Sequence, residues 1–316
     1  MRGLVVAAFA LTACGGGGGG GNNGEGGDSL SRFEEIINVP EDVNVSGDFS
    51  CFTPVADAAT VEWLTSAPGP DADLSGYTID SWVEDFETED EVYDAMVSIY
   101  TDDVVDGSPE ISGTADTNGL ITLSDVPTCT SMTYKTETDP LLDRTKNTYK
   151  AHHFYSPPPA DGDPVDAGSF LSVSTTTYKL IPTILGVTVD DDKSVIAGTA
   201  YDCTRDAGLP SDDDSGKVTG AQVIIYDENG EIPDSLTVNY MTDSFPDNEQ
   251  PYTSPDGLFV ASNVPPGELT IEMWGRVDGE LVLLGASQLF SEASSINIAN
   301  VFGGYGDGVK YPDACE

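Results

Sequence analysis

Residues suited to catalysis are few in this sequence, and their spacing matches no common catalytic motif. The two histidines, His152 and His153, are adjacent. Adjacent side chains of a strand point to opposite faces, so the pair is poorly placed to bind one metal ion, and we expect surface or turn histidines. The sequence has no G-x-S-x-G motif. Gly216-Lys217 is not a phosphate-binding loop, because Ser211 stands where its first glycine belongs. The sequence therefore predicts a protein that is not an enzyme.

Acidic residues dominate the charged positions, with 55 Asp and Glu against 12 Lys and Arg and a net charge of −43. This charge repels nucleic acid and anionic surfaces, so we expect no nucleic-acid partner. A solvated acidic surface is the simplest explanation of this charge, and a saline habitat is a separate hypothesis. A hydrolase that uses paired carboxylates is a further hypothesis, behind the two functions given at the end of this subsection. Asp71-Ala-Asp-Leu-Ser-Gly76 resembles the start of an EF-hand loop, but Trp82 replaces the bidentate glutamate. We expect no cofactor and, at most, weak Ca²⁺ binding.

The five cysteines divide into one near the N-terminus, Cys14, and four in the body of the chain. Those four form an even set without a C-x-x-C pair, which predicts two disulfide bonds rather than a zinc site. Four cysteines allow three pairings, and the sequence does not choose among them. If each domain closes itself, the pairs are Cys51–Cys129 and Cys203–Cys315.

The N-terminal residues have the pattern of an export signal. Arg2 precedes an uncharged run, residues 3–13, that is shorter than the roughly 20 residues of a bilayer span. Leu11-Thr-Ala-Cys14 resembles the lipobox of bacterial lipoproteins, which implies cleavage before Cys14 and lipid attachment to it. An ordinary signal peptide with an incidental cysteine is the alternative. Gly15 after the cysteine resembles an outer-membrane sorting signal, and the glycine-rich residues 15–27 predict a flexible tether.

Two strand-like motifs occur twice in the same order. Ala95-Met-Val-Ser-Ile-Tyr100 matches Ala221-Gln-Val-Ile-Ile-Tyr226, and Asn118-Gly-Leu-Ile-Thr-Leu-Ser-Asp-Val-Pro127 matches Asp256-Gly-Leu-Phe-Val-Ala-Ser-Asn-Val-Pro265. Upstream, 77–85 resembles 195–202. Alternation places Ala95, Val97 and Ile99 on one face. The Asn-Gly and Asp-Gly pairs predict tight turns, and Val-Pro predicts the end of each second strand. Each copy spans roughly 100 residues, enough for its own core.

At these motifs the chain resembles the carboxypeptidase regulatory-like family, whose modules are prealbumin-like β-sandwiches close to the Cna-B and starch-binding-like groups. The second copy fits best, through Gly198-Thr-Ala-Tyr-Asp202, Gly220-Ala-Gln-Val, Asp256-Gly-Leu-Phe259 and Val264-Pro-Pro-Gly267. The first copy departs at Asp94, which replaces a glycine, and at Thr128-Cys129. The resemblance covers about residues 75–302 and implies an all-β protein with two tandem prealbumin- or Ig-like sandwiches.

We therefore expect a signal peptide over 1–13, a lipid-anchored tether over 14–28 and a short helix over 29–40. Two β-sandwich domains follow over 41–180 and 187–316. The apolar stretch Thr177–Gly186 predicts a short helix or a buried connector. Trp82 and Trp274 fall in strand patterns and are expected in the core. Exposed aromatic residues that could contact a sugar or a protein are Trp63, Tyr305 and Tyr311.

These observations predict a non-enzymatic protein of the bacterial cell envelope, held to the outer membrane through Cys14. Its sandwich modules would act as spacers or bind a carbohydrate or an envelope protein. The alternative is an accessory or regulatory lipoprotein of an envelope enzyme or an export system.

Overall fold

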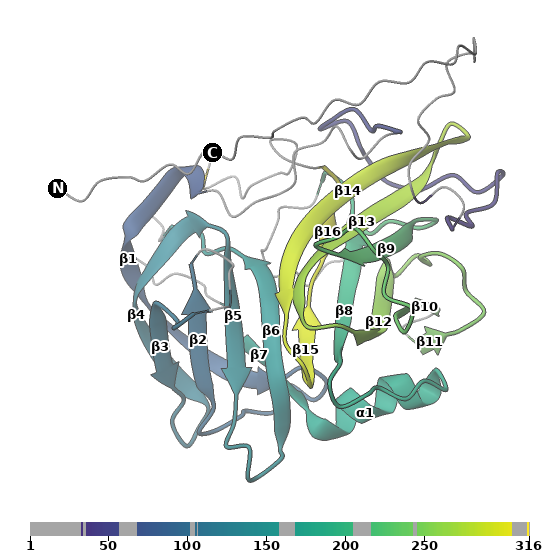
Figure 1. Ribbon diagram of the computed structural model, residues 1–316. Coiled ribbons are helices and arrows are strands. Elements are labelled where there is room, and N and C mark those ends of the chain that lie inside the picture. Colours follow the sequence, from purple (N-terminus) through teal and green to yellow (C-terminus); the bar gives the residue numbers. More distant parts are fainter. Residues whose placement is uncertain are drawn as a thin grey trace, which may run out of the picture.

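The computed structural model describes residues 33, 36–56, 68–101, 105, 107–157, 168–204, 216–242, 245–304 and 315. Within them the chain is all-β apart from one helix, as the sequence predicts. The strands form two lobes that lie side by side (Figure 1). No helix of the described residues is both long and apolar enough to cross a membrane.

The first lobe contains seven strands. Two layers, β1–β4 and β3–β2–β5–β6, enclose its core, and β7 pairs with both β1 and β6. Ala95, Val97 and Ile99 are fully buried there, which confirms the predicted inward face. The strands are β1 (Pro68–Asp85), β2 (Met96–Tyr100), β3 (Ile111–Thr114), β4 (Leu120–Thr130), β5 (Met132–Glu137), β6 (Thr145–His153) and β7 (Phe170–Ser174).

The second lobe is a sandwich with a core between two sheets. The sheet β14–β13–β9 packs against β11–β10–β12–β8–β15, and β16 pairs with β8. Core side chains from both sheets include Ile196, Phe259 and Ile271. The strands are β8 (Ser194–Tyr201), β9 (Gln222–Asp227), β10 (Thr237–Thr242), β11 (Phe245–Asp247), β12 (Leu258–Val264), β13 (Gly267–Val277), β14 (Glu280–Ser291), β15 (Ser295–Ile298) and β16 (Val301–Phe302).

The lobes share one sheet. Strand β15 pairs in parallel with β8 on one side and with β6 on the other, so a 13-stranded sheet runs through both lobes. The backbone ladder is therefore continuous from the far edge of one lobe to the far edge of the other.

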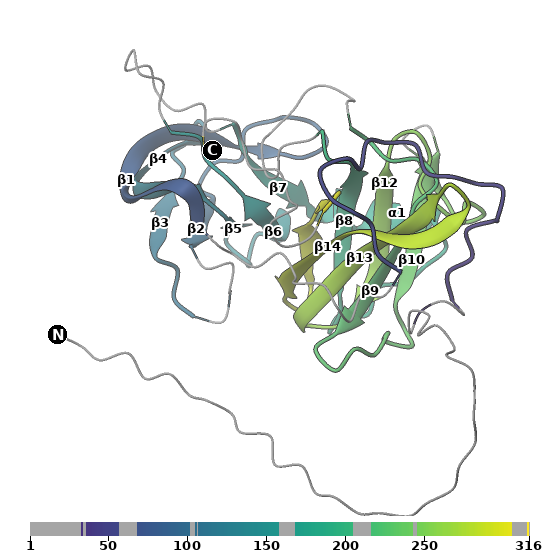
Figure 2. The ribbon, with the colours of Figure 1, turned by 90° about the horizontal axis from the view of Figure 1, so that it is seen from above.

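Both outer faces of the second lobe are covered. Helix α1 (Thr175–Ile184), capped by Ser174, connects the lobes, and Tyr178 packs near Val195, Val260 and Ile296. This confirms the predicted helical connector. On the opposite face, Phe33, Ile37 and Val39 pack with Trp274 and other apolar residues of the three-stranded sheet. Figure 2 shows the purple N-terminal segment beside β13 and β14.

The repeated motifs occupy equivalent strands. The first motif forms β2 and β9, the second forms β4 and β12, and the upstream segments form β1 and β8. The pairings also repeat, because β1–β4 matches β8–β12 and β2–β5 matches β9–β13, all antiparallel. Residues with left-handed backbone also fall at equivalent positions of the two copies, with φ between 57° and 84°. The pairs are Asp94 and Gly220, Gly119 and Gly257, and Asp125 and Asn263.

Three local expectations need correction. Strand β4 does not end at Val126-Pro127 but continues to Thr130, because the proline falls at a register shift against β1, where no ladder N–H is required. Residues 41–56, assigned to the first domain, instead pack on the second lobe, where Val45 N–H donates to Arg276 O and Ser46 N–H to Thr219 O. The predicted helix over 29–40 lies partly outside the described residues, and residues 37–40 are not helical.

Candidate functional site

The residues first expected to carry function lie largely outside the described part of the chain. This applies to the lipidation candidate Cys14 and to the three aromatic binding candidates, Trp63, Tyr305 and Tyr311. Their roles stay predictions. The described residues therefore supply the site discussed below.

The four remaining cysteines form two disulfides, and the pairing that closes each domain on itself is wrong. Cys51 is bonded to Cys203, and Cys129 to Cys315. The first bond fixes the N-terminal segment to the second lobe, which is the far one in sequence. The second bond fixes the C-terminal end of the chain to strand β4 of the first lobe. Each chain end thus crosses to the other lobe, which no spacing in the sequence indicates.

Both histidines are buried, contrary to the expected surface or turn positions. His152 has φ 52° and is 4% exposed, with Nδ1 3.2 Å from Ser131 Oγ. Its Nε2 lies within hydrogen-bond distance of Gln288 O in β14, so this ring joins the two lobes. The ring of His153 packs edge-on against Tyr134 and Tyr155. The positive φ of His152 breaks the strand alternation, and both side chains can then be enclosed.

The two strand tryptophans differ. Trp274 is buried as predicted, and its indole N–H donates to Glu272, which also accepts from Tyr226. Trp82 is 49% exposed, which overturns its core prediction. Ser81 and Val83 face inward on β1, so the side chain between them must face outward, opposite the exposed Leu120 on β4.

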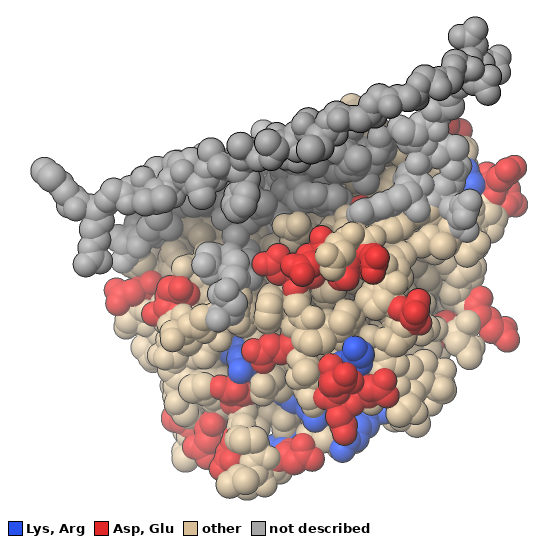
Figure 3. All heavy atoms as spheres, viewed as in Figure 1, with Lys and Arg blue, Asp and Glu red and all other residues tan. Residues whose placement is uncertain are grey.

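The EF-hand-like residues 71–76 lie within strand β1 and do not form a loop. Among the described residues, no group of three or more His, Cys, Asp or Glu could hold a metal ion. Acidic side chains are instead spread across the face shown in Figure 3, with few basic ones between them.

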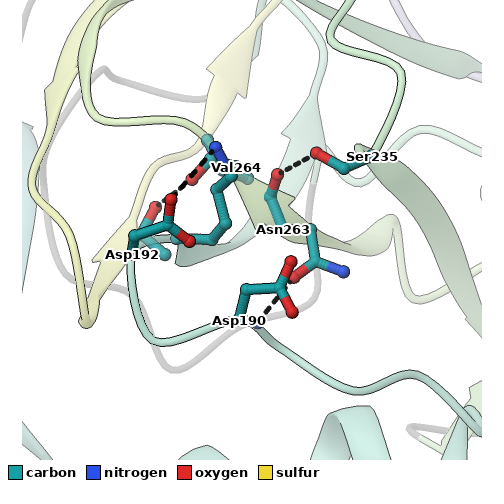
Figure 4. A network of polar contacts seen from close by, with 7 residues as sticks. Asp190, Asp192, Ser235, Asn263 and Val264 are labelled. Atoms are coloured by element: carbon teal, nitrogen blue, oxygen red, sulfur yellow. Dashed lines mark hydrogen bonds and ion pairs between the residues drawn. The ribbon is translucent and has the colours of Figure 1, made fainter.

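A polar network joins the interlobe connector to the second sandwich (Figure 4). Asn263, left-handed with φ 58°, accepts the Asp190 N–H at 2.9 Å and donates to Thr188 O at 3.0 Å. Its own carbonyl accepts from Ser235 at 3.4 Å. This side chain holds the connector against the end of β12, which is a structural role.

The strongest candidate interaction site is the outer edge of β9. In the order β14–β13–β9, this strand pairs with β13 alone among the described strands. Ala221, Val223 and Asp227 direct their backbone groups away from β13, toward Thr253, the Tyr240 hydroxyl and Glu231. Because directions alternate in an antiparallel strand, the backbone of Ile225 faces the same side.

An apolar groove of about 420 Å³ follows this edge. Burial raises the pKa of the Tyr240 hydroxyl, which stays neutral and accepts the Val223 N–H at 2.8 Å. Ile225 lies between the two occupied ends, and none of the described strands pairs with its outer side. The groove is lined by Ile36, Asn38, Gln222, Val223, Ile224, Ile225, Ile232, Leu236, Val238, Tyr240, Gln250 and Pro251.

Acidic residues predominate among the charged residues in the sequence around this groove. No Lys or Arg occurs from Val218 to Gly275. Glu231 and Glu249 adjoin lining residues in sequence, Asp234 lies two residues from Ile232 and from Leu236, and all three are exposed. The sequence shows this charge bias, but it gives no sign that β9 lacks a neighbour, so the groove could not be found without the fold.

No known family model matches the chain, and no curated protein matches it either. Solved structures with similarity include the Bacillus anthracis TIE protein, with 12% identity, a TM-score of 0.23 and coverage of 72% of this chain. This chain spans about a third of the TIE protein chain, 34%. Shaft pilin SpaA from Lactobacillus rhamnosus GG has 10% identity, a TM-score of 0.21 and coverage of 72% of this chain and 98% of its own. BcpA, the major pilin subunit of Bacillus cereus, has 10% identity, a TM-score of 0.21 and coverages of 72% and 100%.

Proposed function

We propose that this protein is a non-enzymatic component of a bacterial cell envelope, anchored by lipid at Cys14, in which two joined sandwiches serve as a rigid spacer that presents a binding surface. The observation that carries the proposal is the way the lobes are joined. A shared sheet and two crossed disulfides fix both ends of the folded body. Disulfides persist in oxidising compartments, which fits an exported protein.

The anchor is tested by fractionating cells that express the full chain or its Cys14→Ser variant, with Thr12→Ser as a matched control. We expect the wild type and the control in the membrane fraction, labelled by a fatty-acid analogue. The Cys14→Ser variant should lose the label and leave that fraction, since several acyl chains hold a protein firmly where none would. Continued membrane fractionation of this variant would contradict the anchor.

The binding role is tested with the soluble chain from Asp28. A glycan array and a pull-down from envelope extract separate a carbohydrate ligand from a protein partner. Binding to sugars alone supports a carbohydrate module, and absence of both leaves a spacer.

A second candidate, an accessory lipoprotein of an envelope enzyme or export system, is favoured by the open edge of β9. An unpaired strand edge is suited to bind another polypeptide. Recovery of a defined envelope enzyme in the pull-down supports this candidate.

A further inference from the structure

The two lobes treat the same strand edge differently. Positions Val97 and Ile99 of β2 correspond to Val223 and Ile225 of β9 through the repeated motif. In the first lobe this edge is covered by β3, where Gly113 is opposite Val97 and Ile111 is opposite Ile99. In the second lobe, the next strand is β10, which pairs with β12 on the other sheet. Figure 1 shows β3 beside β2 and β10 beside β12.

One end of this strand edge has the same backbone contact in the two lobes. Ala115 N–H donates to Ala95 O in the first lobe, and Thr253 N–H donates to the equivalent Ala221 O in the second. Between this contact and the Asp227–Glu231 turn, the second lobe has no strand among its described residues. The open stretch therefore lies in the place of part of the four-residue strand β3, because the Tyr240 hydroxyl already binds the Val223 N–H.

We propose that the β9 edge accepts a short extended strand from a partner polypeptide with basic residues flanking an apolar or small-residue core. This inference rests on the proposed binding function and identifies its partner as a protein segment. The strand would pair with the backbone of Ile225 and occupy the groove between β9 and Leu236 and Val238, as β3 occupies its place beside β2.

The charge around the β9 edge favours a basic polypeptide segment over a second copy of this chain. The exposed Glu231, Asp234 and Glu249 lie within two residues of lining residues in the sequence, and no Lys or Arg lies between residues 218 and 275. A second copy would place two equally acidic edges together, which is unfavourable, whereas a basic segment is attracted. The aliphatic lining also differs from the exposed aromatic surfaces on which sugars stack.

The experiment uses the soluble chain from Asp28 and two kinds of probe. The first is a peptide of residues 107–118, which contains β3, with Glu110→Lys and Asp116→Lys. The second is a display library of ten-residue peptides with alternating apolar positions and Lys or Arg at both ends. Binding is measured by titration, and the site is read from NMR shifts and hydrogen exchange of the Ile225 amide.

We expect bound peptides to protect the Ile225 amide and to bind more weakly at high salt. Two N-methylated peptides are compared, one methylated at the odd-numbered positions and one at the even-numbered positions. One should lose binding and the other should keep it, because only every second peptide N–H faces β9. Side-chain docking without strand pairing would not produce this alternation.

Matched variants locate the site. Leu236→Asp in the groove should lower affinity at least tenfold, and Leu142→Asp, on an exposed loop of the first lobe, should change it less than twofold. Asp234→Lys should lower affinity for the basic peptide about threefold or more, with Glu280→Lys as its control. Because Asp234 is exposed, this variant tests the groove even if Leu236→Asp fails to fold.

Three outcomes would overturn the inference: no probe binds the folded chain, binding leaves the Ile225 amide unaffected, or Leu236→Asp folds and retains full affinity. If the protein forms a dimer in solution and Asp234→Lys strengthens that dimer, the edge belongs to an interface with a second copy instead. All these measurements use the unlipidated chain, so failure of the Cys14 anchor leaves them intact, and their failure leaves the anchor and spacer roles standing.

Discussion

The first and second lobes repeat the same framework, yet they close its edges by different means. In the first lobe, β3 completes the sheet that contains β2. In the second, β10 joins the opposite sheet, and the Tyr240 hydroxyl takes one of the backbone donors that a strand would otherwise satisfy. In the first repeat β3 covers β2 and ends the sheet, whereas in the second repeat β9 ends the sheet and part of its edge is open among the described residues. The edge proposed to bind a partner thus arises from a difference in which sheet one strand joins.

The two disulfides provide the largest expected effect on this comparison. Cys129→Ala combined with Cys315→Ala frees the C-terminal end from the first lobe and should lower the free energy of unfolding by about 2–5 kcal/mol. Cys51→Ala with Cys203→Ala should instead increase hydrogen exchange in residues 36–56 and on the sheet face they cover. Urea unfolding and exchange mass spectrometry measure both. An unchanged unfolding midpoint for the first pair would show that the lobes do not depend on the crossed tail.

Exchanging the residue types at one pair of equivalent positions, Gly198 and Ser81, tests how closely the neighbouring chain packs against each position. Gly198 corresponds to Ser81, and a Cβ atom at Gly198 would lie 1.9 Å from Ala299 O and 2.7 Å from a Phe259 ring carbon. Gly198→Ser should therefore destabilise the protein by about 2–3 kcal/mol. Ser81→Gly should cost about 1 kcal/mol, from backbone entropy and one lost hydrogen bond. Equal effects in thermal unfolding would contradict the tighter packing of the second lobe.

The left-handed residue before each first motif allows a milder exchange. Asp94 has φ 57° and Gly220 has φ 84°. Non-glycine residues in this region cost roughly 1–2 kcal/mol. Gly220→Asp should destabilise by about 1 kcal/mol, and Asp94→Gly should be neutral or slightly stabilising. If both variants lowered the melting temperature equally, side-chain contacts rather than backbone conformation would govern this position.

The smallest expected effect is a pH dependence of one turn in the first lobe that the equivalent turn of the second lobe does not share. Hydrogen bonds from the backbone N–H groups of Asn118 and Leu120 lower the pKa of Asp116. Their stabilisation is complete above the ordinary pKa near 3.9 and is lost as the pH falls through the lower folded value. The equivalent turn of the second lobe uses the hydroxyl of Ser254, which does not titrate there. In an NMR titration, the Asn118 amide should therefore shift at acid pH as its hydrogen bond to the Asp116 carboxylate is lost. The hydrogen bond from the Asp256 N–H to the Ser254 hydroxyl should not be lost in the same way.

Much of the fold follows from local pattern. Alternating apolar residues and paired turn motifs predict the repeated strands, because each strand buries one face and each turn needs a left-handed residue. The exposed Leu120 beside the buried Ile121 matches that expectation, whereas β2 and β9 are buried on both faces. Two expectations failed, the strand end at Pro127 and the buried position of Trp82, because the partner strands decide where a register shift occurs and which face of a strand is covered.

The candidate site was much less accessible to sequence reasoning. The acidic bias of residues 218–275 is visible in the sequence, but a charge run usually marks a solvated surface. Only the pairing of β10 with β12 reveals that β9 has an open side, and two strands of similar composition can join either sheet.

The sequence by itself determined the all-β class, the internal repeat, the even set of four cysteines and the strong negative charge, because these depend on residue type and short-range spacing. The tertiary structure alone decided the crossed disulfides, the sheet shared through β15 and the open edge of β9. Those features depend on contacts between residues far apart in the chain, where spacing carries no information about which partners meet.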